Sequence, residues 1–289
     1  MIRINNSVVN VERYPAGEQR LKFDVRPDSK YFVEWLYERE EELVTLIFMC
    51  GHIRTHGGIL DFLYVPYFPN ARMDRVVKSD EVFTLKYFSD MINGLGFAKV
   101  YINNPHSDVC MGLVNHSENA FLIPDSGIVS SPCESYNDTA CCLISHNDHV
   151  ILRLIRQLHL SEQTDILFYP DSGCARKYEG VLQFPYLIGH KHRDWRSGKI
   201  TGLDVVGLPP GAPFNALIID DISSYGGTFL HSAKKLKALG ADKVYLFVTH
   251  CENAILQGEL IHSGLLERIY TTKSIFTETH PLIEIVEDK

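Results

Sequence analysis

Apolar residues along the chain occur in two patterns that alternate from one end to the other. Short runs of β-branched and aromatic residues predict buried strands, and longer stretches with apolar residues three or four positions apart predict amphipathic helices. The predicted strands span residues 20–25, 31–37, 61–65, 99–102, 165–169, 217–221 and 243–249. The predicted helices span residues 81–95, 148–160 and 227–239. Residues 38–56 fit either element, because the apolar run Val44–Phe48 follows glutamates that suit a first helical turn.

Strands that alternate with helices predict an α/β protein with mostly parallel sheets flanked by helices. The polar, turn-rich stretch from Asp125 to Asn147 is the best candidate for a domain boundary. We therefore expect two α/β domains, an N-terminal one over residues 1–146 and a C-terminal one over residues 147–289.

The composition of the 289-residue chain narrows the class of protein further. Its formal net charge of −8 gives no indication of binding to nucleic acid or to an anionic membrane. No apolar run approaches the roughly 20 residues that span a bilayer, and the N-terminus lacks the apolar core of a signal peptide. We therefore expect a cytoplasmic protein.

The seven cysteines are expected to be reduced thiols, because their number is odd and no export signal precedes them. A metal cluster is the alternative for one group of cysteines and histidines, but its spacing fits no common zinc pattern. This group comprises Cys133, Cys141, Cys142, His146 and His149.

The segment from Ala216 to Thr228 carries the most informative chemistry. Its apolar strand ends at the paired carboxylates Asp220 and Asp221, and Gly226 and Gly227 open the predicted helix. Backbone N–H groups of such a glycine loop can bind a phosphate at a helix N-terminus. Carboxylates can accept hydrogen bonds from sugar hydroxyls or hold a metal. The segment therefore favours a ribose phosphate ligand, with an ordinary strand-to-helix turn as the alternative.

Three other strand ends carry polar clusters. Arg72 and Arg75 flank Asp74 after one predicted strand, and their guanidinium groups suit phosphate oxygens, although a surface ion pair is the alternative. His106 and Asp171 each follow another predicted strand. Open α/β sheets bind ligands at the carboxyl ends of their strands, so these residues are candidates for a binding site.

The segment from His190 to Lys199 gathers positive charge in an acidic protein, because Lys191, Arg193 and Arg196 lie within it. We expect a polar loop that closes over a substrate and stabilises phosphate charge, with a solvated charged loop as the alternative. The sequence contains no G-x-x-x-x-G-K-[ST] loop, so any ATP is expected to bind by other means.

Together these motifs resemble those of the ribose-phosphate diphosphokinases, also called phosphoribosyl diphosphate (PRPP) synthases. The resemblance extends from about Arg13 to about Ile275. Residues 66–75, Pro-Tyr-Phe-Pro-Asn-Ala-Arg-Met-Asp-Arg, are similar to the family's Pro-Tyr-aromatic…Ala-Arg-Gln-Asp-Arg motif, and residues 13–18 to its adenine-binding loop. The resemblance implies two phosphoribosyltransferase-like domains, Mg²⁺ as cofactor, and a homodimer or a higher homo-oligomer.

The resemblance also implies a reaction, the transfer of the β,γ-diphosphate of ATP to the anomeric hydroxyl of a ribose 5-phosphate unit, with release of AMP. Lys191 and Arg193 would be catalytic, and His106 and Asp171 would meet the metal. The ATP-binding residues would be Tyr14, Glu18, Arg72, Asp74, Arg75 and His106. The ribose-phosphate-binding residues would be Asp171, Asp220, Asp221, Ser224, Tyr225, Gly226, Gly227 and Thr228.

Several positions depart from the family pattern. Ser224 and Tyr225 replace Asp-Thr in the phosphate loop, Asn104 replaces an Asp, and Ala16 replaces an Asp in the adenine loop. An aromatic ring at the rim of the phosphate loop favours an acceptor larger than ribose 5-phosphate, and ADP-ribose in NAD salvage is the leading candidate. Phage-type synthase homologues that diphosphorylate ADP-ribose share the Asn-Ala-Arg-Met-Asp-Arg motif, which is an analogy. Ribose 5-phosphate is the alternative acceptor.

Two other functions stay open. A phosphoribosyltransferase shares the glycine loop but needs neither the motif at residues 66–75 nor a second α/β domain. A non-catalytic regulatory subunit of the synthase type would not need both Lys191 and Arg193.

Overall fold

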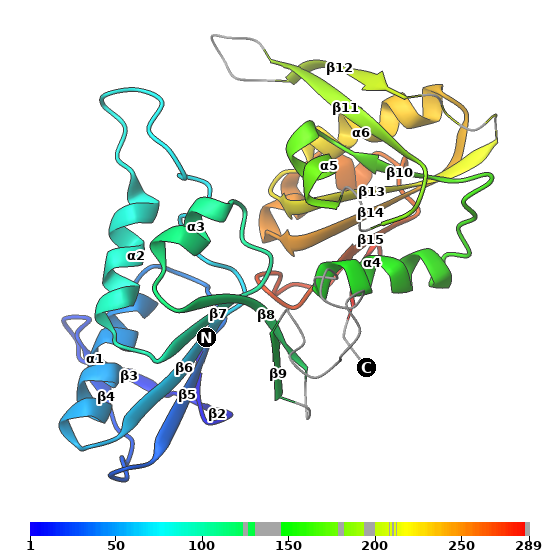
Figure 1. Cartoon of the computed structure of the whole chain (residues 1–289). Coiled ribbons are helices and arrows are strands. Elements are labelled where there is room, and N and C mark those ends of the chain that lie inside the picture. The colour runs from blue at the N-terminus through cyan, green and yellow to red at the C-terminus, as the bar shows by residue number, and fades with distance from the viewer. Residues whose placement is uncertain are drawn as a thin grey trace. The chain divides into compact units, whose positions relative to one another are not determined.

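The computed structural model describes residues 1–123, 127–130, 146–178, 182–193, 200–207, 209, 211 and 213–286. The chain divides into two compact units, Met1–Ser135 (unit 1) and Tyr136–Lys289 (unit 2), which are coloured blue to green and green to red (Figure 1). None of the described helices combines the length and the apolar character that a membrane crossing requires.

Unit 1 contains a sheet whose described strands follow the order β2-β1-β5-β6-β7-β8-β9. These strands are β1 (Ile2–Ile4), β2 (Ser7–Val8), β5 (Lys30–Trp35), β6 (Ile59–Val65), β7 (Lys99–Ile102), β8 (Ser117–Ile123) and β9 (Gly127–Ser130). The central strands β5 to β8 run parallel, whereas β1, β2 and β9 pair antiparallel at the two sides. The helices α1 (Glu42–Thr55), α2 (Thr84–Gly94) and α3 (Asp108–Leu113) connect successive parallel strands. A separate antiparallel hairpin consists of β3 (Val11–Arg13) and β4 (Gln19–Leu21).

Unit 2 contains a second sheet, with its described strands in the order β12-β11-β10-β13-β14-β15-β16. These strands are β10 (Ile166–Tyr169), β11 (Tyr186–Arg193), β12 (Ile200–Val206), β13 (Phe214–Ser223), β14 (Ala241–Cys251), β15 (Arg268–Thr271) and β16 (Ile283–Ile285). All neighbouring strands in this sheet are parallel except β11 and β12. The helices are α4 (His146–Gln157), α5 (Ser172–Tyr178) and α6 (Gly227–Ala238), with short 3₁₀ turns η2 (Asn253–Gln257) and η3 (Leu260–His262). The predicted α/β class with mostly parallel sheets is therefore confirmed.

Strand β13 illustrates why a continuous apolar run becomes a central parallel strand. Ala216 and Ile218 pack into one apolar core of unit 2, and Leu217 and Ile219 pack into a second core. A strand that is buried on both faces requires apolar residues at every position, as is typical of parallel sheets. The predicted buried strand is thus the middle of a longer one.

Residues 38–56 fit either element in the sequence, and within them Glu42–Thr55 form helix α1. Leu43, Leu46, Cys50 and Ile53 recur at helical spacing and are all buried in the core of unit 1. This period can bury one face of a helix but not one face of a strand. The helix is followed by Gly57 with a φ of 75°, a left-handed conformation that costs glycine little.

The predicted loop at residues 190–199 is wrong for residues 190–193, which belong to β11. Strand β10 pairs with β11 only from Tyr186 to Ile188, whereas β12 pairs with β11 as far as Arg193. The segment therefore forms an antiparallel ribbon beyond the parallel part of the sheet. Its polar residues suit that position, because a two-stranded ribbon leaves side chains exposed, as at His190 and His192. Residues 194–199, with Arg196 and Lys199, lie outside the described residues.

Strand β4 is also shorter than predicted, since it ends at Leu21 rather than at Val25. The four described cysteines, Cys50, Cys110, Cys174 and Cys251, are free and buried. Burial raises the pKa of the Cys50 thiol to about 12, so the thiol stays neutral. Cys133, Cys141 and Cys142 of the alternative metal cluster lie outside the described residues, as does the side chain of His146.

Candidate active site

Three neighbouring strands of unit 2 bring charged residues to one edge of its sheet. Asp171 follows β10, Lys191 lies in β11, and Asp220 and Asp221 lie near the carboxyl end of β13. The Nζ atom of Lys191 donates a hydrogen bond of 2.9 Å to Oδ2 of Asp171. The side chain of Lys191 is only 13% exposed and that of Asp171 is 47% exposed, so the lysine is held at the edge of the sheet. Lys191 and Asp171 were predicted as site residues, and the fold brings them into direct contact.

Asp171 also fixes the start of helix α5. Its Oδ1 atom accepts a hydrogen bond of 3.0 Å from the backbone N–H of Cys174, which is the N-cap arrangement that acidic residues favour. Burial alone would raise the pKa of Asp171, but the Cys174 N–H and the Lys191 ammonium lower it, and the net shift is downward. Asp171 is therefore held as a carboxylate whose two oxygens point at different partners.

The paired acids at the end of β13 are in a different electrostatic state. Burial, and then the charge of Asp221, raise the pKa of Asp220 well above its usual value, although Lys191 opposes the shift. The backbone N–H of Asp221 donates a hydrogen bond of 3.0 Å to Oδ1 of Asp220. Two adjacent carboxyl groups thus share a partly enclosed space, and Asp220 is the one that retains a proton more readily.

This raised pKa predicts how stability depends on pH. The folded protein binds a proton at Asp220 at pH values at which the unfolded chain, with a pKa near 3.9, has lost it. The contribution of this proton to stability is therefore present at low pH and is lost as pH rises toward the raised pKa. We expect Asp220→Asn to increase the melting temperature relative to the wild type, by an amount that grows as pH rises from the pKa of the unfolded chain toward the raised pKa of the folded protein. Asp90→Asn, at an exposed position on α2, is the control, and a difference for Asp220→Asn that stays constant with pH would contradict the shift.

The glycine loop connects β13 to α6. Gly226 has a φ of 78°, which a residue with a side chain rarely adopts, and Gly227 is the first residue of the helix. The first N–H groups of α6 lack intrahelical acceptors, so Gly227 and Thr228 can present backbone donors to an anion. Tyr225 is 59% exposed and lies at the rim of this loop, next to the partly exposed Ser224.

A segment that includes Gly258 and Leu260 packs against the glycine loop and fixes its position. A Cβ atom at Gly258 would lie 1.9 Å from the carbonyl oxygen of Tyr225, and one at Gly226 would lie 2.7 Å from Cδ2 of Leu260. Gly258, which lies between η2 and η3, and Leu260 of η3 therefore approach the loop so closely that only glycine fits at positions 226 and 258. Sequence reasoning does not predict this contact, because Gly258 lies outside every motif.

A buried network of polar residues lies at the carboxyl ends of β14 and β15. The Nδ2 atom of Asn147 donates to Oγ1 of Thr249 over 3.0 Å, and Nδ1 of His250 lies 2.9 Å from Oγ of Ser274. The carbonyl oxygen of Thr249 accepts a further hydrogen bond of 2.7 Å from Oγ1 of Thr272. Buried hydrogen bonds of this kind fix the edge of the sheet next to the acids.

In unit 1 the predicted phosphate-binding residues lie at the carboxyl ends of two adjacent parallel strands. Arg72, Asp74 and Arg75 follow β6 and His106 follows β7, and Val65 of β6 is in register with Ile102 of β7. Arg72 and His106 are exposed. Nε of Arg75 lies 3.2 Å from Oδ1 of Asp74. These two side chains therefore form the surface ion pair that the sequence offers as the alternative to phosphate binding.

The predicted adenine-binding residues occupy the turn of the β3–β4 hairpin. The N–H of Tyr14 donates to the carbonyl oxygen of Glu18 over 2.9 Å, and Gly17 takes a φ of 92°. The side chains of Tyr14 and Glu18 are both exposed, so the turn presents them to solvent. The side chain of Arg193, the second predicted catalytic residue, lies outside the described part of the chain.

Within the described residues, no group of three or more His, Cys, Asp and Glu side chains is arranged to hold a metal ion. Mg²⁺ commonly binds through one or two protein carboxylates together with phosphate oxygens and water. Asp171 already accepts hydrogen bonds at both oxygens. The described donors therefore fit a magnesium ion that is shared with a substrate phosphate, and not one that is held by the protein alone.

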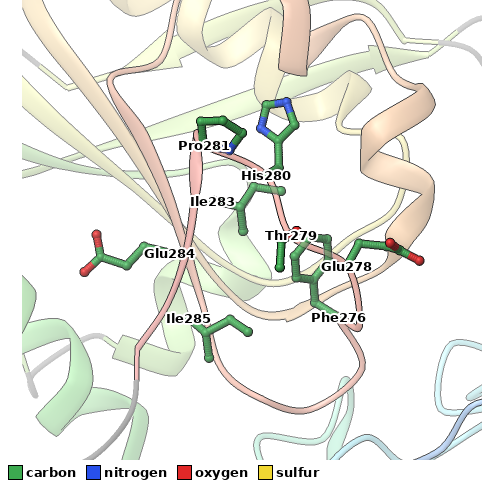
Figure 2. Close-up of a pocket in the computed structure, with 8 residues that line it drawn as sticks. All are labelled: Phe276, Glu278, Thr279, His280, Pro281, Ile283, Glu284 and Ile285. Atoms are coloured by element: carbon green, nitrogen blue, oxygen red, sulfur yellow. The ribbon is translucent and has the colours of Figure 1, made fainter.

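A hollow of about 550 Å³ lies elsewhere in unit 2, between the end of β15 and β16. Figure 2 shows that Phe276 and Ile285 line it together with other residues of the segment 276–285. None of the predicted site residues contributes to this hollow, so it is separate from the candidate site.

Two α/β units and a glycine loop after paired acids define a protein of the phosphoribosyltransferase-like class. The curated ribose-phosphate pyrophosphokinase of Thermococcus kodakarensis is 25% identical over 247 residues, which cover 84% of this chain and 77% of that protein. Ribose-phosphate pyrophosphokinase 1 of Lactococcus lactis is 26% identical over 295 residues, covering 100% of this chain and 80% of that protein. These similarities over most of the chain support a divergent member of the ribose-phosphate pyrophosphokinase, or PRPP synthase, family.

Solved structures agree with this fold. The crystal structure of phosphoribosylpyrophosphate synthetase from Mycobacterium smegmatis matches with a TM-score of 0.72 and 17% identity, over 97% of this chain and 86% of that chain. No model of a protein family matches the sequence.

Proposed function

We propose that the protein transfers the β,γ-diphosphate of ATP to the anomeric hydroxyl of a ribose 5-phosphate unit. The observation that carries the proposal is the cluster of Lys191, Asp171 and the paired acids at one edge of the sheet, beside the glycine loop. The names of the curated relatives, which are pyrophosphokinases of ribose phosphate, support the same reaction.

In this proposal the anomeric oxygen of the acceptor attacks the β-phosphorus of ATP. The bond between that phosphorus and the oxygen that bridges to the α-phosphate breaks, AMP leaves with the bridging oxygen, and the hydroxyl proton passes to solvent. Asp220 and Asp221 accept hydrogen bonds from the ribose hydroxyls, and the N–H groups of Gly227 and Thr228 bind the 5-phosphate. Lys191, with Arg193, neutralises the negative charge that develops on the transferring group.

The phosphate donor is assigned to residues of unit 1. Arg72 and His106 are exposed at the carboxyl ends of adjacent strands, where cationic and imidazole groups can meet ATP phosphates. Tyr14 and Glu18 on the hairpin turn are assigned to the adenine. Mg²⁺ supplies positive charge that offsets the charge of the phosphates when it is bound, and His106 and Asp171 are the residues assigned to it.

The test is release of AMP from ATP and Mg²⁺ with ribose 5-phosphate or ADP-ribose as acceptor. Stoichiometric AMP and a diphosphorylated acceptor are the expected products. Release of inorganic diphosphate from PRPP in the presence of a nucleobase would instead identify a phosphoribosyltransferase. Protein that binds ATP but releases no AMP with either acceptor would be a regulatory subunit.

We further propose that ADP-ribose is the preferred acceptor, which would place the enzyme in NAD salvage. The observation that favours it is the exposure of Tyr225, whose ring lies at the rim of the loop rather than packed inside the protein. A 5-phosphate that continues into a diphosphate and an adenosine needs an open exit, and an exposed ring can stack on that extension.

The ratio of kcat/KM values for ADP-ribose and ribose 5-phosphate tests this acceptor. We expect a higher value for ADP-ribose and a loss of about 5-fold for that substrate alone in Tyr225→Thr, since an aromatic contact contributes about 1 kcal/mol. A preference for ribose 5-phosphate that is unchanged in Tyr225→Thr would exclude ADP-ribose and leave the diphosphate transfer intact.

The close contact between Gly258 and the glycine loop gives a separate prediction. Because a Cβ at Gly258 would overlap the Tyr225 carbonyl, Gly258→Ala must displace the loop. We expect KM for the ribose-phosphate acceptor to rise at least 10-fold while KM for ATP is unchanged, as measured by initial rates. Gly94→Ala is the matched control, since nothing lies within 4 Å of a Cβ there. Equal increases in the KM values for the acceptor and for ATP would contradict a specific role of the Gly258 contact in acceptor binding.

A further inference from the structure

Two turns at the carboxyl ends of adjacent strands in unit 1 share an uncommon backbone conformation. Asn70, in the turn after β6, has a φ of 64°, and Asn104, in the turn after β7, has a φ of 44°. Few residues other than glycine adopt this left-handed conformation, because it brings the Cβ atom close to the following carbonyl oxygen. Asparagine tolerates it better than most residues, and residues held in such conformations cluster at binding sites.

The two turns present their residues in the same order. Each left-handed asparagine is followed by a buried residue, which is Ala71 in one turn and Pro105 in the other. The next residue is exposed, and it is Arg72 in the first turn and His106 in the second. The order of left-handed, buried and exposed residue therefore occurs twice, and each time the exposed residue is one that is assigned to the ATP phosphates.

Hydrogen bonds hold both turns. The backbone N–H of Met73 donates to the carbonyl oxygen of Asn70 over 2.9 Å, which closes the first turn. In the second turn, the backbone N–H of Asn104 donates over 3.0 Å to Oδ1 of Asn119 in β8, and Asn104 is only 1% exposed. A residue before proline usually takes an extended conformation, so the surroundings of Asn104 determine its backbone.

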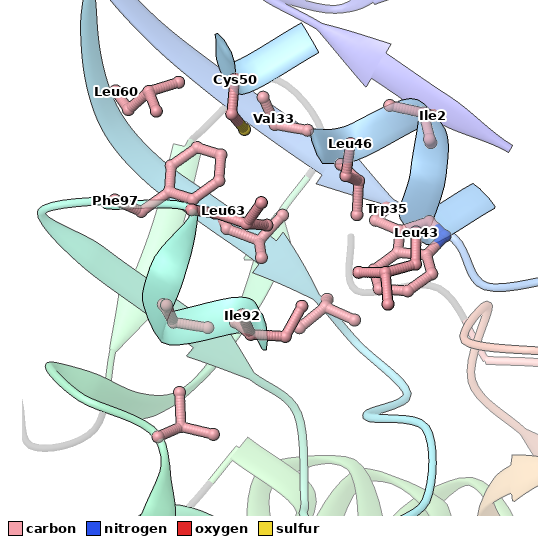
Figure 3. Packing of buried hydrophobic residues seen from close by; sticks show 14 of the residues in the cluster. Ile2, Val33, Trp35, Leu43, Leu46, Cys50, Leu60, Leu63, Ile92 and Phe97 are labelled. Atoms are coloured by element: carbon pink, nitrogen blue, oxygen red, sulfur yellow. The ribbon is translucent and has the colours of Figure 1, made fainter. Parts of the chain in front are cut away.

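The strands that carry the turns are firmly packed. Leu60 and Leu63 of β6 lie in the core of unit 1, as Figure 3 shows, and Val100 and Ile102 of β7 belong to the same core. Close-packed interiors deform little, so the ends of β6 and β7 are fixed. The conformation of the two turns then decides where the guanidinium and imidazole groups lie.

We propose that Asn70 and Asn104 are positioning residues for ATP, because their left-handed backbone sets the two turns from which Arg72 and His106 reach the phosphates. This inference rests on the proposed function, in which Arg72 and His106 bind ATP. Alanine disfavours the left-handed conformation, whereas glycine adopts it readily. Replacement by alanine should let a turn relax, and binding of ATP would then have to restore it.

Titration calorimetry with a non-hydrolysable ATP analogue and Mg²⁺ tests the positioning. We expect Asn70→Ala and Asn104→Ala each to weaken binding by about 5-fold or more, since a left-handed alanine is disfavoured by about that factor. Asn70→Gly and Asn104→Gly should recover most of the lost affinity, because glycine keeps the backbone conformation. KM for the ribose-phosphate acceptor, from initial rates of AMP release, should change much less than the affinity for the analogue.

The matched control is Asn6→Ala. Asn6 has a φ of 68° in the exposed turn between β1 and β2, so this variant disturbs a left-handed asparagine of the same unit outside the two turns. Its affinity for the analogue should equal that of the wild type. Asn119→Ala removes the acceptor of the Asn104 N–H and leaves the turn sequence intact, and it should also weaken binding. A circular dichroism melt verifies that each variant is folded.

Two sets of results would overturn the proposal. Wild-type affinity in either folded alanine variant, equal losses in the alanine and glycine variants, or an equal loss in Asn6→Ala would overturn the positioning alone, with the proposed reaction intact. Failure of the wild type to bind the analogue would overturn the assignment of ATP to Arg72 and His106, and the positioning with it.

Discussion

Lys191→Ala is expected to lower kcat by roughly 10²-fold or more, because removal of one preorganised donor to developing phosphate charge typically has that effect. The side chain of Lys191 is mostly buried and its ammonium group is bonded to Asp171, so the folded ribbon positions the charge before substrate arrives. KM for ATP should change much less than kcat. Initial rates of AMP release give both values.

The matched control for this variant is Lys243→Ala. Lys243 is an exposed lysine near the amino end of β14, at the opposite end of the strands from Lys191. Its replacement should leave kcat unchanged. Arg193→Ala is also expected to lower kcat. Full activity in both variants would show that the ribbon at residues 190–193 takes no part in catalysis.

The double variant Asp220→Asn, Asp221→Asn is expected to abolish use of the ribose acceptor and to spare ATP binding. The carboxyl groups are the acceptors proposed for the ribose hydroxyls, and amide groups cannot reproduce two acceptor oxygens on each side chain. The ATP-binding residues are assigned to unit 1, so they are not affected directly. Titration calorimetry with ADP-ribose, ribose 5-phosphate and a non-hydrolysable ATP analogue measures the two affinities.

The opposite result, loss of ATP binding with retention of acceptor binding, would reverse the assignment of the two substrates. The single variant Asp220→Asn removes the charge of this side chain and keeps its size and shape, so it measures how much acceptor binding depends on the charge. Because the pKa of Asp220 is raised and the group is readily protonated, its amide should be tolerated better than that of Asp221.

The sequence predicted those elements whose stability comes from local pattern. The strand predicted at residues 99–102 coincides with β7, and the glycine loop lies between β13 and α6 as its motif indicates. Both depend on residues within about a dozen positions of each other. Local periodicity and turn chemistry are sufficient in such cases.

Features that depend on distant contacts were not predictable in this way. The polar composition of residues 190–193 predicts a loop because it lacks an apolar face, whereas pairing with β12 makes the segment a ribbon. The hydrogen bond between Asn147 and Thr249 joins residues 102 positions apart. The close approach of Gly258 to Tyr225 joins residues that are separated by helix α6 and strand β14. Tertiary packing decides each of these, and a single sequence contains no direct record of it.

The pairing of β11 has a consequence for the kinetics of amide hydrogen exchange. Ile218 lies in β13, which has strands on both sides, so exchange of its amide requires opening of the central sheet. Lys191 is paired with β12 alone, and an isolated two-stranded ribbon is marginally stable in water. Local opening of the ribbon therefore costs much less free energy than opening of the sheet. Amide protons at residues 190–193 should exchange in a separate, faster group, so that Lys191 can change position through fluctuations that leave the rest of unit 2 folded.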